Sequence, residues 1–152
     1  MTVQEIVALA ANAILNDGGV QSWCEATFGQ GLCVFIGIDE HNPPDRTYWP
    51  LAAIIDATEL KSDNQKYQQF GLVLGSAVVN DTVTTVGSLH TYAGMLQAEE
   101  LRGRVESALF AANIGHQVEC SGDSSAVSSH PYYISYSAVT ISLLKSSRHA
   151  VR

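Results

Sequence analysis

The residues of this chain that could carry out chemistry gather most densely between positions 39 and 45, around a Pro-Pro pair. Carboxylate and imidazole groups, which can bind a metal ion or transfer protons, are supplied there by Asp39, Glu40, His41 and Asp45. Their spacing lacks the glycine and the alternating ligands of a calcium-binding loop, and a polar loop at a sheet edge has the same composition. Two interpretations therefore stay open, a surface loop or a small metal-dependent enzyme that uses Asp39, Glu40 and His41.

A second group could supply a nucleophile, since His116, Cys120 and Asp123 lie close together in the sequence. A cysteine thiolate needs a base and an orienting group that converge on it. The neighbouring residues are those of an ordinary strand and turn, so we interpret this group as structural. The other cysteines, Cys24 and Cys33, form no Cys-x-x-Cys pair, which predicts reduced thiols and no zinc site. We therefore predict no catalytic residue, no cofactor and no metal ion.

The remaining candidates are residues suited to contacts between proteins. Aromatic and arginine side chains beside a rigid loop are the types that contribute most binding energy at interfaces, and Arg46, Tyr48 and Trp49 follow the two prolines. Trp49 could equally fold back and cap the sheet. We expect the segments 39–49 and 80–94 and the C-terminal tail to contact neighbouring chains. The predicted contact residues are Arg46, Tyr48, Trp49, Asp81, His90 and Tyr92.

The composition also favours assembly. Charged residues make up 15% of the 152 residues and hydrophobic residues 46%, whereas an average soluble domain has about 25% charged residues. A single domain of this size that is so short of charge has difficulty covering its surface, so part of that surface is expected to lie against other chains. The formal net charge of −7 opposes binding to phosphate backbones. The longest apolar runs are too short to span a membrane, so we predict neither nucleic-acid recognition nor membrane insertion.

The segment 95–112 has the pattern of an amphipathic helix that must bury one stripe against strands. The apolar stripe contains Met95, Ala98, Leu101, Val105, Ala108, Leu109 and Ala112, and the charged residues Glu99, Glu100, Arg102, Arg104 and Glu106 are expected largely on the other side. Asn113 and Gly115 supply the helix stop. Residues 2–16 predict a first helix that begins with a Thr2–Glu5 capping box and ends at the Asp-Gly-Gly of positions 17–19.

Strand patterns fill most of the rest of the chain. The predicted strands are 31–38, 51–57, 70–79, 117–120 and 133–144, of which the first is expected to be covered on both faces. The predicted connections are 39–49, 58–68, 88–94 and 121–130, and residues 145–152 are predicted to be a flexible or partner-docking tail. Residues 21–30 are ambiguous, as are residues 82–94, where TVTTV has strand propensity and 88–94 has the pattern of a loop that leads into the following helix.

In order and length, these elements resemble the tail terminator family of tailed bacteriophages. The resemblance rests on the first helix, TVQEIVALAANAIL, and on the late helix, EELRGRVESALFAA. A short strand, a loop and Pro131 then lead into the last strand, YYISYSAVTISLL. The resemblance covers most of the chain and includes no diagnostic motif. It implies a single α+β domain with one mixed, mostly antiparallel β-sheet, on which the N-terminal helix and the second amphipathic helix pack.

The resemblance also implies a structural function without catalysis. Six subunits would form a homo-oligomeric ring in the virion neck, assembled in the host cytoplasm, which caps the tail tube protein and joins it to the head–tail connector proteins. DNA would pass through the lumen, which suits an acidic chain. A head-completion protein of the same neck is a close alternative. From other classes, the metal-dependent enzyme and a ligand-binding module with a pocket between the predicted helix 95–112 and the sheet stay open.

Overall fold

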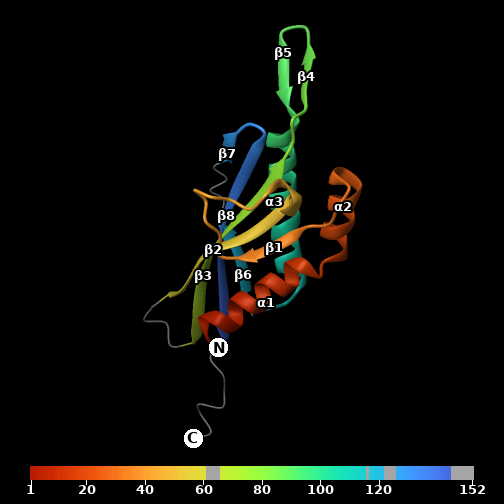
Figure 1. The fold of residues 1–152 in the computed structure, drawn as a ribbon. Coiled ribbons are helices and arrows are strands. Elements are labelled where there is room, and N and C mark those ends of the chain that lie inside the picture. Colours follow the sequence, from red (N-terminus) through yellow and green to blue (C-terminus); the bar gives the residue numbers. More distant parts are fainter. Residues whose placement is uncertain (61–65, 116, 122–125, 145–152) are drawn as a thin grey trace, which may run out of the picture.

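A computed structural model describes residues 1–60, 66–115, 117–121 and 126–144. It has an α+β fold in which the α-helices lie on one side of a long β-sheet (Figure 1). The helices are α1 (Val3–Leu15), α2 (Gly18–Phe28), the short 3-10 helix η1 (Arg46–Tyr48) and α3 (Ala93–Ala111). The strands are β1 (Cys33–Ile36), β2 (Leu51–Leu60), β3 (Tyr67–Val79), β4 (Val83–Val86), β5 (Leu89–Tyr92), β6 (Gln117–Ser121), β7 (Ala126–Ser129) and β8 (Tyr132–Leu144).

The main sheet is mixed and mostly antiparallel, as predicted. Its strand order is β1-β2-β3-β8-β6, and β7 also pairs with β8. The β1–β2 pair is parallel and the other pairs are antiparallel. Strands β3 and β8 pair along their full 13 residues, from Tyr67 opposite Leu144 to Val79 opposite Tyr132. This long central pair is the frame on which the other elements are placed, and the predicted fold class is confirmed.

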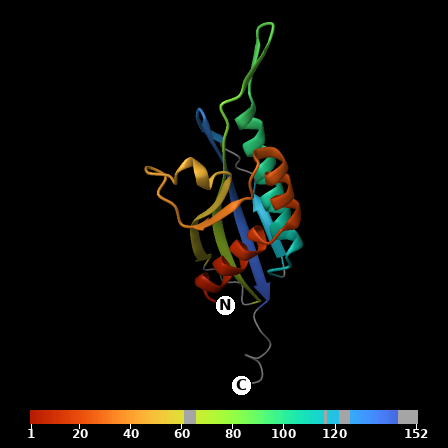
Figure 2. The same ribbon diagram turned by 45° about the vertical axis from the view of Figure 1, so that its right-hand side comes forward.

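The helices cover one face of this sheet, and the larger part of the core lies between them. Helix α3 packs on β3 and β8, α1 packs on β1 and β2, and α2 packs against α3 (Figures 1 and 2). The largest fully buried side chains of this core include Ile6, Ile14, Phe70, Leu72, Leu74, Leu101, Leu109 and Ile141. A separate, smaller cluster lies on the opposite face, which carries no α-helix and is called the helix-free face below, and contains Trp49, Leu51, Ala53 and Ala77.

The helix ends follow from local capping chemistry. The Thr2 hydroxyl accepts the Glu5 N–H at 3.1 Å, so the predicted start of α1 is confirmed. The predicted role of the Asp-Gly-Gly segment was wrong in one respect. Asp17 starts a second helix, because its carboxylate accepts the Val20 N–H at 2.8 Å, and α2 ends at Gly29 with φ +80°. Asn113, with φ 52°, takes the left-handed conformation just after α3, as predicted.

Helix α3 differs from its predicted pattern on both sides. Met95 and Ala112 are exposed, whereas the five stripe residues between them are buried. Three charged residues predicted on the outer side instead face the sheet, where Arg102 bridges Glu99 at 3.0 Å and Glu106 at 2.8 Å. The opposing positions of β8 are serines, and these buried hydroxyls accommodate the carboxylates. Ser135 donates to Glu99 and Ser137 donates to Glu106, each at 2.6 Å.

Several strand and loop boundaries also need correction. Strand β1 lies at the sheet edge and was wrongly predicted to be covered on both faces, since Ile36 is 63% exposed. Strands β2 and β3 extend into the predicted connection 58–68, of which 61–65 lie outside the described residues. The predicted loops 88–94 and 121–130 contain β5 and β7. The predicted tail 145–152 and residues 122–125 lie outside the described residues. Among described residues, no helix is long and apolar enough to cross a membrane.

Candidate partner-contact site

Strands β4 and β5 form a hairpin that is exposed along almost its whole length. The two strands pair with each other in a separate sheet, and they project beyond the end of the main sheet and of α3 (Figures 1 and 2). Gly87, with φ +62°, takes the first position of the two-residue turn, where hairpins favour glycine. The hairpin carries its apolar side chains into solvent. Val86 and Leu89, opposite each other at the tip, are 77% and 66% exposed.

The hairpin is also free of formal charge. Residues 82–98 contain no Asp, Glu, Lys or Arg, although exposed loop tips usually carry polar or charged residues. The strand register places Val86 and Leu89 on one face with Thr84 and Thr91. An uncharged, apolar surface that projects from the body of a protein is typical of a contact with another protein.

The base of the hairpin joins two of the predicted contact residues. Arg46 on η1 and Asp81 form an ion pair at 2.9 Å, which links segment 39–49 to the start of the hairpin. The hydrogen bond and charge of Asp81 raise the pKa of Arg46. Both side chains are at least half exposed, and solvent screens such a pair, so it contributes little to stability. The ion pair instead fixes a position, because it joins η1 to the start of the hairpin.

The other predicted contact residues occupy different environments. His90 contacts the Thr85 hydroxyl at 2.9 Å within the hairpin. The Tyr92 ring meets the His130 ring edge-on, with 5.2 Å between centroids, at the β7–β8 turn. Tyr48 remains exposed. Trp49 is 3% exposed, and its indole N–H donates to the Pro44 carbonyl at 2.9 Å. The alternative in which Trp49 folds back to cap the sheet is thus the arrangement found, and Trp49 offers little surface to a partner.

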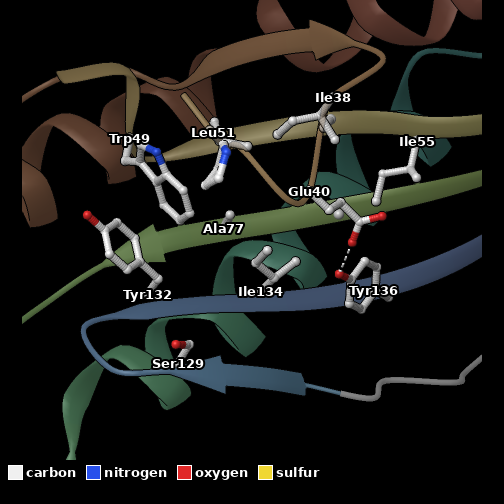
Figure 3. A pocket seen from close by; sticks show the side chains of 13 residues that line it. Ile38, Glu40, Trp49, Leu51, Ile55, Ala77, Ser129, Tyr132, Ile134 and Tyr136 are labelled. Carbon is white, nitrogen blue, oxygen red and sulfur yellow. Dashed lines mark hydrogen bonds between the residues drawn. The ribbon is translucent and has the colours of Figure 1, made fainter. Parts of the chain in front are cut away.

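A hollow of about 270 Å³ lies beside Trp49 on the helix-free face. Its walls come from segment 37–50 and from β2, β3, β7 and β8, and its side chains converge from these five parts of the chain (Figure 3). The lining residues include Ile38, Leu51, Ile55, Ala77, Ile134 and Tyr132. At one end, the Tyr136 hydroxyl donates to the Glu40 carboxylate at 2.6 Å. Burial, followed by this hydrogen bond, raises the pKa of Tyr136 to about 12.

The sequence predicted no hollow at this place. The alternative with a pocket placed it on the other side of the sheet, between α3 and the strands. Two sequence signals could have indicated the hollow. Gly75 and Ala77 leave little side chain on one face of β3, and Ile134 and Tyr136 alternate on the same face of β8. Periodicity alone does not tell which face of a strand the helices cover.

The acidic segment 39–45 is arranged as a set of local turns. Asp39 accepts the His41 N–H at 3.0 Å, and Asp45 accepts the Thr47 N–H at 3.0 Å as the cap of η1. Glu40 turns away from both to meet Tyr136. Within the described part of the chain, no three His, Cys, Asp or Glu side chains come together as potential metal ligands.

The second candidate group cannot be assembled from the described residues. His116 and Asp123 lie outside them. Burial, followed by the charge of Glu106, raises the pKa of Cys120 to about 11. Burial likewise raises the pKa of Cys24 to about 11. A thiolate is the reactive form of cysteine, so neither group has the environment of an activated nucleophile.

We therefore expect Cys24 and Cys120 to react slowly with iodoacetamide in the folded protein. A pKa of about 11 lowers the thiolate fraction at pH 7.5 by roughly two orders of magnitude relative to a free cysteine. Peptide mass spectrometry over a time course should show both sites labelled at least tenfold more slowly than in urea-unfolded protein. Rapid native labelling of Cys120 would contradict this environment.

No protein-family model matches this chain, and no curated protein matches it. The fold and the site describe an α+β domain with a projecting apolar hairpin and a hollow on its helix-free face.

Proposed function

We propose that this chain is the subunit of a homo-oligomeric ring, and that the ring is a tail terminator in the neck of a tailed bacteriophage. The observation that carries the assembly is the projecting hairpin. An isolated two-stranded hairpin is marginally stable in water, and here its tip residues Val86 and Leu89 are largely exposed. A neighbouring copy that covers this surface would supply the missing burial.

The terminator function is supported by the order of the elements. The elements follow one another in the order of the tail terminator family that the sequence resembles. This order is an N-terminal helix, strands with one long projecting loop, an amphipathic helix and a long closing strand. The partners would be the tail tube protein and the head–tail connector proteins. The net charge of −7 suits a ring through which DNA moves without adhering.

The test of assembly is the mass of the native particle. At micromolar concentration, native mass spectrometry and light scattering should give a multiple of the 16.3 kDa chain, and six copies for the proposed ring. Electron microscopy of the same sample should show rings. A stable species of 16.3 kDa across the concentration range would contradict the proposal.

The test of the terminator function needs a second protein. The assembled ring, added to polymerising tail tube protein, is expected to shorten the tubes and to be found at their ends. Rings that leave tube length unchanged would leave the chain an oligomer of another function.

A further inference from the structure

We propose that the hairpin of one copy docks in the hollow of the next copy, with Val86 and Leu89 seated in the apolar part of the hollow. This inference rests on the proposed assembly and names its contact. The hairpin projects away from the main sheet in both views, so it does not fill the hollow of its own chain (Figures 1 and 2). A hairpin on one copy and a hollow on the next make a head-to-tail contact, the type that forms a ring when the rotation between copies closes.

The sizes of the two surfaces match. A cavity of about 150 Å³ lined by apolar residues holds a benzene-sized group, and the hollow measures about 270 Å³. It therefore has room for two side chains of valine or leucine size. Val86 and Leu89 lie opposite each other at the hairpin tip, so both can enter together.

The order of apolar and polar groups also matches. On the hairpin, the hydroxyls of Thr84 and Thr91 lie two residues behind the tip on the same face, about 7 Å along the strands. In the hollow, the polar end is formed by Tyr136, which lies two residues after Ile134 on β8, and by Glu40, which accepts its hydrogen bond. A tip seated beside Ile134 places the threonine hydroxyls at this polar end, where the Glu40 carboxylate can accept from them.

The charges of the two surfaces are compatible. Among the described residues that line the hollow, Glu40 alone is charged, and the hairpin has no formal charge. Docking therefore buries apolar surface and adds no buried unpaired charge, whose desolvation would cost free energy.

The experiment uses two full-length variants that damage opposite halves of the contact. Leu89→Asp places a charge on the hairpin tip, and Ser129→Trp fills the hollow from an exposed lining position. We expect each variant alone to be folded by circular dichroism and to lose at least tenfold in apparent self-affinity. An equimolar mixture should form a heterodimer, because the intact hairpin of one variant meets the intact hollow of the other.

The matched control is Thr85→Asp, which puts the same charge on the opposite face of the hairpin. We expect this variant to assemble like the unmodified chain. If Leu89→Asp assembles normally, or if the folded variants fail to pair when mixed, the hairpin–hollow contact is wrong while the ring proposal stands. A monomeric unmodified chain overturns both. If Ser129→Trp assembles normally but loses binding of a hydrophobic dye, the hollow is a small-molecule site and the inference falls.

Crosslinking tests the same contact with smaller substitutions, in case Ser129→Trp does not fold. Leu89→Cys and Ser129→Cys proteins, mixed and mildly oxidised, should give a disulfide-linked dimer that neither protein gives alone. The native cysteines are present in both single-variant controls. Absence of the mixed dimer while the proteins remain assembled would overturn the contact.

Discussion

The variant Gly94→Ala is expected to lower the free energy of unfolding by about 2–3 kcal/mol, through overpacking of the core. The added Cβ would lie 2.3 Å from Cδ2 and 2.4 Å from Cε2 of Tyr133. This ring cannot swing aside, because it is 3% exposed, packs in the main core and has its hydroxyl 2.7 Å from a ring nitrogen of His130. Urea denaturation followed by circular dichroism measures the loss.

Gly103→Ala is the matched control on the same helix. A Cβ at Gly103 would meet nothing within 4 Å, so the change acts through helix propensity and is expected to raise stability by about 0.5–1 kcal/mol. The two substitutions add the same methyl group with opposite expected signs. A similar shift for both would mean that the close approach of α3 to Tyr133 does not constrain the fold.

Sequence reasoning succeeded where a local pattern carries the information. The Thr2 cap, the Asn113 stop and the long alternating strand β8 each depend on residues close together in the chain. The prediction was wrong where the same residues fit two different structural patterns. Asp17 followed by two glycines fits a helix end as well as a helix start, and the capping hydrogen bond of Asp17 decided for the start.

The candidate site was predicted only as a set of segments. Segments 39–49 and 80–94 were both expected to make contacts, but the Arg46–Asp81 pair joins residues 35 positions apart, and no local pattern predicts that pairing. The hairpin was missed because Leu89 to Tyr92 has a weak strand pattern in isolation and gains its structure by pairing with β4. The hollow depends on which face of the sheet the helices leave open, which is a tertiary property.

The charged residues of α3 likewise depend on a tertiary contact that a local pattern does not contain. Helical spacing placed Glu99, Arg102 and Glu106 away from the apolar stripe, but α3 lies close enough to β8 for the two carboxylates to accept hydrogen bonds from buried serines. The hydrogen bond from Ser135, followed by the contribution of Arg102 and opposed by burial, lowers the pKa of Glu99. Lowering of this pKa means that the ionised carboxylate is the form the fold stabilises. The serines on the helix-facing side of β8 were the sequence signal for this network.

Glu106→Ala is expected to lower the free energy of unfolding by about 2–3 kcal/mol. It removes the acceptor of the buried Ser137 hydroxyl and one of the two carboxylates that hold Arg102, whose Nε already has no hydrogen-bond partner among the described residues. Glu100→Ala is the control, since it removes an exposed partner of Arg104 on the same helix and should cost less than about 0.5 kcal/mol. Urea titrations of both variants at pH 7 measure the difference. Equal losses would show that burial of Glu106 against Ser137 adds nothing beyond an ordinary surface ion pair.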